Sequence, residues 1–137
     1  MAHLQEVNLS YNFLMSIPIE LSLLPNLREL DLSGNFIHAP FSDNLLLPPS
    51  LKVLGLQENR LTVISPKIAS LQNLEELYLK GNSISSLPEC LTALSQLKTL
   101  DVSFNPLREL PSFLCDLTGL EELSLEGIGL RSMPEDI

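Results

Sequence analysis

Residues 74–84 of the chain, LEELYLKGNSI, follow the spacing L-x-x-L-x-L-x-x-N-x-L. The same spacing recurs in both directions at intervals of 23 or 24 residues, with units starting at Leu4, Leu27, Leu51, Leu74, Leu97 and Leu120. Only the last unit lacks the asparagine, because Ile128 stands in its place. A fixed period of this length is typical of proteins built from stacked structural repeats. We therefore predict a single domain over residues 1–137, made of six units of which the last is incomplete.

The two halves of each unit have different apolar periods. In the first half, Leu77 and Leu79 alternate with polar residues, which predicts a short strand with inward leucines. In the second half, apolar residues after Pro88 or Pro111 recur at three- and four-residue steps, which suits a short helix or 3₁₀ segment. Each strand needs a neighbouring unit to cover its apolar residues, so the strands should stack into a parallel sheet. Because helical segments are wider than strands, the stack should bend with the sheet on its concave face. We expect one column of buried leucines along it: Leu30, Leu54, Leu77, Leu100 and Leu123.

These units resemble the intracellular class of leucine-rich repeats, whose fuller form is L-x-x-L-x-L-x-x-N-x-L-x-x-L-P-x-x-L-x-x-L, over nearly the whole chain. Scribble-like scaffolds, Ras-pathway adaptors and ROCO-type kinases belong to that class. The resemblance implies an α/β leucine-rich repeat solenoid, with short helical or 3₁₀ segments on its convex face, that acts as a protein-interaction module and not as an enzyme. Residues 38–50, HAPFSDNLLLPPS, depart from the pattern by one extra residue and by Ala39-Pro40-Phe41 near the expected Leu-Pro, which predicts an irregular convex wall there.

The repeated asparagines have two interpretations, a ligand-facing row or a structural ladder. We favour the ladder, because a side chain with both donor and acceptor can satisfy backbone groups where the chain leaves the strand. Ile128 cannot supply such bonds, so the sixth turn should be built differently, with Gly127 and Gly129 relaxing its backbone. The predicted ladder consists of Asn12, Asn35, Asn59, Asn82 and Asn105.

The outward strand positions carry most of the functional signal. The third, fifth, seventh and eighth places of the units hold eight of the seventeen acids but only one of the eight bases, Lys80. Aromatic residues at Tyr11, Tyr78 and Phe104 lie among them and could anchor a partner. The alternative is that acids simply solvate an exposed sheet face. We predict partner contacts at Glu29, Asp31, Glu76, Tyr78, Asp101, Phe104 and Glu122, within an acidic strip that also includes Glu6, Glu58 and Glu126.

Composition narrows the class of partner. A net charge of −9 repels nucleic acid and anionic lipid, so a protein with a basic surface is the better expectation. No apolar run approaches the roughly 20 residues that a membrane-spanning helix needs, and residues 1–9 lack the pattern of a secretion signal. Cys90 and Cys115 should be reduced thiols, and we expect a cytoplasmic location. His3 and His38 form no recognisable metal or catalytic constellation, so we expect no metal, cofactor or small-molecule substrate.

Two functions therefore compete. The first is an adaptor or scaffold segment that holds a partner on its acidic concave face. The second is a structural spacer or autoregulatory segment of a larger signalling enzyme, such as a ROCO-type kinase. Neither end of the sequence shows the polar capping element that a repeat stack needs, so we expect the chain to be a fragment of a longer protein.

Overall fold

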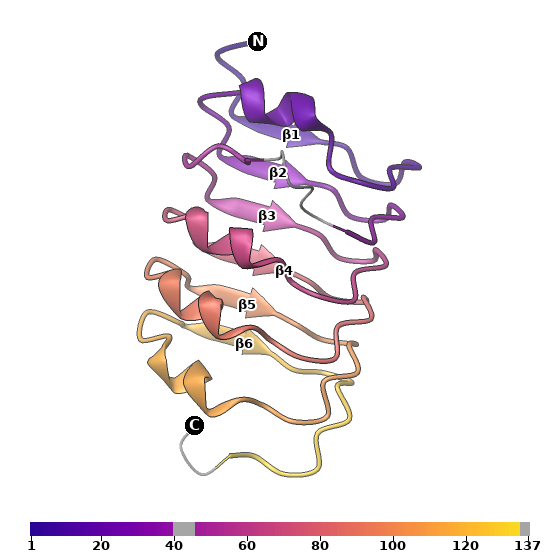
Figure 1. Cartoon of the computed structure of the whole chain (residues 1–137), viewed down its shortest axis with the longest axis vertical. Coiled ribbons are helices and arrows are strands. Elements are labelled where there is room, and N and C mark those ends of the chain that lie inside the picture. The colour runs from indigo at the N-terminus through magenta and orange to yellow at the C-terminus, as the bar shows by residue number, and fades with distance from the viewer. Residues whose placement is uncertain (40–45, 135–137) are drawn as a thin grey trace.

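The computed structural model describes residues 1–39 and 46–134, which form one stack of repeats (Figure 1). Six parallel strands pair in the order of the sequence, and each begins at the third residue of its unit. This register confirms the predicted strand positions. The strands are β1 (Glu6–Asn8), β2 (Glu29–Asp31), β3 (Val53–Gly55), β4 (Glu76–Tyr78), β5 (Thr99–Asp101) and β6 (Glu122–Ser124).

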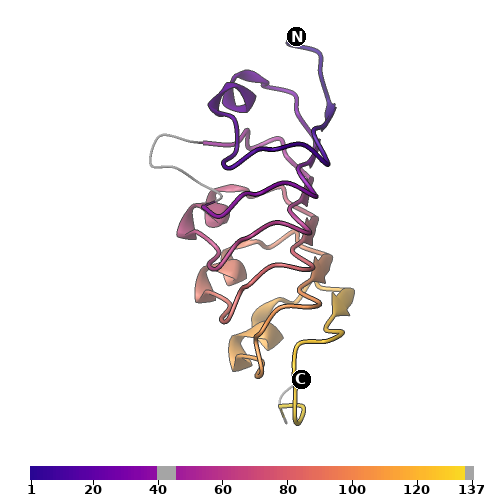
Figure 2. The same cartoon turned by 90° about the vertical axis from the view of Figure 1, so that its right-hand side faces the viewer.

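The second halves of four units contain 3₁₀ helices, which line the side opposite the sheet (Figure 2). Pro88 and Pro111 directly precede two of them, as predicted, and each helix directs one buried leucine or isoleucine into the core. In unit 2 the described residues show no such helix, and Phe41 lies outside them. Leu47 and Pro48 are buried in that unit. The four helices are η1 (Ile19–Leu23), η2 (Pro66–Ser70), η3 (Glu89–Ala93) and η4 (Ser112–Asp116).

The core lies between the sheet and the helical side. Leu30, Leu54, Leu77 and Leu100 are at most 1% exposed and occupy matching register positions on β2 to β5. Each such side chain contributes about 1.5 to 3 kcal/mol of burial free energy. The prediction was wrong for Leu123, which is only half-buried. Within the described residues, β6 pairs with β5 on one side and with no strand on the other, so less of this leucine is covered.

Four of the five ladder asparagines, at positions 35, 59, 82 and 105, are buried and connect neighbouring units. Asn82 Nδ2 donates to Leu79 O of its own unit at 2.9 Å and to Leu56 O of the preceding unit at 3.0 Å. Its Oδ1 accepts a hydrogen bond from Leu61 N of the preceding unit at 2.9 Å. Asn12 is exposed, and its side chain donates only to Leu9 O and Ser10 O of its own unit.

The turn bonds change where Ile128 replaces the asparagine. Gly129 has a positive φ of 79°, in line with the altered sixth turn expected from the sequence. That expectation was incomplete, because the fifth unit changes as well. Leu107 N has no asparagine to reach in the sixth unit and instead donates to Asn105 O at 2.9 Å. Arg108 then adopts a φ of 62°, and its N donates to Ile128 O at 2.9 Å.

The eighth position of every unit has a positive φ, and bulky residues alternate there with glycine. Tyr11 is followed by Gly34, Glu58 by Gly81, and Phe104 by Gly127. Each bulky side chain lies over the glycine of the next unit, because a Cβ atom on those glycines would come within 2.5 to 2.7 Å of it. Glycine both adopts the left-handed backbone without strain and leaves room for the neighbouring side chain.

Candidate functional site

The predicted contact residues all lie on one surface, which we call the strand face: the third, fifth, seventh and eighth positions of the units. Glu29 and Glu122 are exposed, and Phe104 is 46% exposed. Asp31, Glu76, Tyr78 and Asp101 are half-buried. The register places Tyr78 beside Asp101, whereas Glu29 and Asp31 on β2 are separated from Glu76 and Tyr78 on β4 by β3.

Glu76 and Tyr78 form a fixed pair at the centre of the strand face. Tyr78 Oη donates to Glu76 Oε1 at 2.6 Å. This hydrogen bond, partial burial and the nearby carboxylates of Glu76, Glu122 and Asp101 raise the pKa of Tyr78 from its usual 10.0 to about 12. Tyr78 therefore stays neutral across the physiological range of pH.

Two aspartates of the strand face are held by serines two residues later. Asp31 Oδ1 accepts hydrogen bonds from Ser33 N at 2.9 Å and Ser33 Oγ at 2.6 Å. Asp101 Oδ1 accepts from Ser103 N at 3.0 Å. These bonds fix the carboxylates before any partner arrives, which reduces the entropy that binding must cost.

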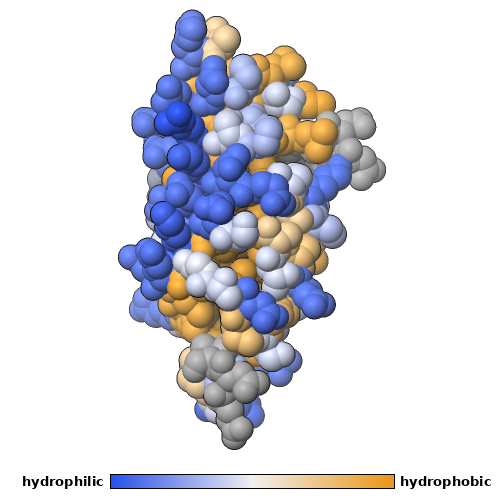
Figure 3. All heavy atoms as spheres, turned by 90° about the vertical axis from the view of Figure 1, so that its left-hand side faces the viewer, coloured by the Kyte–Doolittle hydropathy of each residue, from blue (hydrophilic) through white to orange (hydrophobic). Residues whose placement is uncertain are grey.

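Three lysines on or beside the strand face are already engaged. Lys80 Nζ lies 5.5 Å from the centroid of the Phe104 ring, within the range of a cation–π interaction. At the second position of the units, Lys98 Nζ lies 3.3 Å and Lys52 Nζ 4.0 Å from the Glu75 carboxylate. A side view shows hydrophilic residues gathered along the sheet side and more hydrophobic ones toward the helices (Figure 3).

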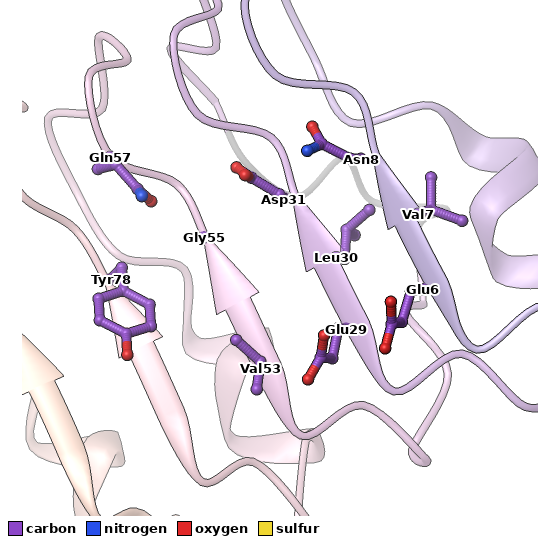
Figure 4. A pocket seen from close by; sticks show the side chains of 10 residues that line it. All are labelled: Glu6, Val7, Asn8, Glu29, Leu30, Asp31, Val53, Gly55, Gln57 and Tyr78. Carbon is purple, nitrogen blue, oxygen red and sulfur yellow. The ribbon is translucent and has the colours of Figure 1, made fainter.

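The strand face contains a hollow of about 430 Å³ that the sequence reasoning missed (Figure 4). Its floor is β3, where Val53 and Gly55 stand between the polar side chains of β2 and β4. Gln57 reaches over Gly55, and the other lining residues come from β1, β2 and β4. The fifth positions of the units read Asn, Asp, Gly, Tyr, Asp and Ser, so the signal was the one glycine in that column.

Other chemistry has little basis in the described residues. Within residues 1–39 and 46–134, no group of three or more His, Cys, Asp or Glu side chains could hold a metal ion. No helix in this part of the chain is long and apolar enough to cross a bilayer. Cys90 is half-buried, Cys115 is exposed, and both are free thiols.

Family models cover most of the chain. Residues 49–107 match the model for a leucine-rich repeat, and residues 2–45 match the model for two copies of leucine-rich repeats. The chain belongs to the leucine-rich repeat family. Adenylate cyclase of Schizosaccharomyces pombe is 40% identical to it over 88 residues, which is 63% of this chain and 5% of that relative.

Solved leucine-rich repeat structures have the same architecture. A leucine-rich repeat protein of Leptospira interrogans superposes with a TM-score of 0.76 and 32% identity, covering 91% of this chain and 38% of that one. The plant peptide hormone receptor RGFR1 in complex with RGF2 superposes with a TM-score of 0.73 and 31% identity, covering 90% and 20%. The chain thus spans well under two thirds of the length of each of these three proteins.

Proposed function

We propose that this leucine-rich repeat chain is a protein-interaction module that binds a partner with a basic surface on its acidic, concave strand face. Leucine-rich repeat domains generally mediate protein–protein interactions, and RGFR1 was solved in complex with RGF2. The observation that carries the proposal is the charge asymmetry of the strand face. Its positions hold eight acidic residues and one basic residue, Lys80, which already contacts Phe104. We propose an adaptor or scaffold role for this chain. We propose no chemical reaction for it.

The proposal predicts that neutralising the central acids weakens binding of a basic probe. The probe is a peptide of alternating lysine and glycine, and the variant combines Asp31→Asn, Glu76→Gln and Asp101→Asn. Because hydrogen bonds to charged groups contribute about 1.5 to 3 kcal/mol each, the affinity measured by calorimetry should fall at least about tenfold.

The matched control removes three acids from the helical side with Glu20→Gln, Glu89→Gln and Asp116→Asn, all of which are exposed. Both variants have the same net charge, so a difference between them reports the location of binding and not the overall charge. Equal loss of affinity in the two variants would overturn the proposal. Absence of probe binding to the unmodified chain would overturn it as well.

A further inference from the structure

We infer that the hollow over β3 is a subsite for one lysine side chain of the partner, an inference that rests on the proposed function of the strand face. The hollow differs from the rest of that face because β3 presents an apolar floor. At the third and fifth positions β3 has Val53 and Gly55, whereas β2 has Glu29 and Asp31 at the same register positions.

The dimensions suit an extended aliphatic side chain. Asp31 on β2 and Tyr78 on β4 are the register partners of Gly55 on either side, so about two strand spacings, roughly 9.6 Å, separate their backbones. Gly55 contributes no side chain to the space between them, and the Gln57 side chain extends over part of it (Figure 4). A lysine stem of four methylene groups can lie along such an apolar floor while its ammonium group stays among polar atoms.

The polar atoms at the rim are acceptors: Gln57 Oε1, which has no donor among the described residues, and Asp31 Oδ1, which already accepts from Ser33. Gln57 Oε1 is buried and accepts no hydrogen bond from any residue that the structure describes. It lies 2.9 Å, and Asp31 Oδ1 3.3 Å, from the point where a Cβ atom on Gly55 would stand. Glu29, on the same strand as Asp31, also lines the hollow.

An ammonium group matches this arrangement. It offers three donors and no acceptor, so it can donate to Gln57 and Asp31 while Glu29 adds a further negative charge to the lining. A buried acceptor left unpaired is costly, so a turn of the Gln57 amide toward a bound donor would add to the attraction of the carboxylates. A neutral apolar side chain would fill the floor but would bring neither a donor for Gln57 Oε1 nor a positive charge to balance Asp31 and Glu29. A lysine of the partner therefore fits the hollow best, because its stem suits the apolar floor and its ammonium group suits the acceptors at the rim.

The test uses the whole ¹⁵N-labelled chain and a blocked Gly-Gly-Lys-Gly-Gly peptide, with norleucine in place of lysine as the control peptide. The lysine peptide should cause saturable shifts of the amides of Gly55, Gln57 and Tyr78, and the norleucine peptide should not. Shifts of equal size with both peptides, or shifts spread evenly over the six strands, would overturn the inference.

Two pairs of variants locate the subsite. Gly55→Val fills the hollow with a residue that suits a strand, and the φ of Gly55 is not in the left-handed region. It should weaken binding of the lysine peptide at least about tenfold, whereas Ser124→Val at the same position of β6 should change it less than about twofold. The second pair, Asp31→Asn and Asp101→Asn, does not alter packing. Only Asp31→Asn should weaken binding of the lysine peptide. Retained binding in Gly55→Val and Asp31→Asn would refute the subsite.

The failures of the two proposals can be told apart. In one outcome, the alternating lysine–glycine peptide binds the unmodified chain and loses that binding in the triple-acid variant, while the single-lysine peptide causes only unlocalised shifts. This result would refute the subsite and keep the proposed function. Binding of neither peptide would refute both.

Discussion

The turns around Asn82 and Ile128 occupy the same place in their units and solve the same problem differently. Both residues are buried, at 8% and 2% exposure. Around Asn82, the amide of Leu61 in the preceding unit donates to the asparagine side chain. Around Ile128, the equivalent amide of Leu107 bonds to a carbonyl two residues before it in the chain. Each of the four buried ladder asparagines thus completes the turn of the unit before it, so a substitution acts on the upstream neighbour.

The largest expected change in stability comes from substituting Ile128, the apolar residue of the two. Ile128→Ala should lower the free energy of unfolding by about 2 to 5 kcal/mol, because it removes buried methylene groups and leaves a cavity. Urea denaturation followed by circular dichroism measures this change. A loss no larger than that of an ordinary surface substitution, about 0.5 kcal/mol, would show that Ile128 does not anchor the last turn.

Asn82→Ala should lower the free energy of unfolding by about 1 to 3 kcal/mol. The Leu61 amide loses its acceptor, whereas Leu56 O keeps Asn59 Nδ2 and Leu79 O keeps Asn105 Nδ2 as donors. Hydrogen exchange should therefore accelerate first at Leu61, in the preceding unit. Asn12→Ala is the control, since Asn12 is exposed and bonds only within its own unit. Faster exchange confined to the unit of Asn82 would contradict the upstream effect.

A smaller effect is expected where the units meet at the eighth position. Gly81→Ala should cost about 1 to 2 kcal/mol, because alanine is strained at the left-handed φ of 71°. The clash with the Glu58 carboxylate adds little, since that carboxylate can move aside. Thermal unfolding of Gly81→Ala beside Gly119→Ala provides the comparison, because Gly119 has no positive φ and its Cβ position meets only atoms at 3.4 Å or more. Equal melting temperatures would argue against backbone strain at Gly81.

The smallest effect concerns pH. The pKa of Tyr78 is higher in the folded chain than its usual value of 10.0, so its contribution to stability is complete below pH 10 and is lost as pH rises through about 12. Glu76→Gln removes the carboxylate that accepts its hydrogen bond, so the pKa of Tyr78 should fall toward 10.0. Tyrosinate absorbance against pH measures this shift. An unchanged titration in Glu76→Gln would mean that the hydrogen bond is not the main cause.

The strand register and the inward leucines could be predicted because they depend on periods within one unit. Around Leu77, apolar and polar residues alternate whatever the other units contain. The burial of Leu77 follows once the strands pair in order. The exposure of Leu123 depends on whether another strand covers β6, which no local period encodes.

The candidate site was predictable only at the level of charge. Acids at fixed places indicate an acidic strip, but the hollow over Gly55 results from three strands read side by side and from the conformation of Gln57. The unpaired oxygen of Gln57 has no signature in the sequence, since glutamine at a seventh position is an ordinary polar residue. The role of each acidic residue in partner binding stays a prediction.

The alternation of bulky residues and glycine at the eighth position has a consequence for how such an array can change length. Tyr11 with Gly34, Glu58 with Gly81, and Phe104 with Gly127 divide six units into three couples. Deleting a single interior unit would place two bulky residues, or two glycines, next to each other, whereas deleting a couple would leave the alternation intact. We therefore expect natural variants of this stack to gain or lose units in twos, and chimeras joined out of phase to fold poorly.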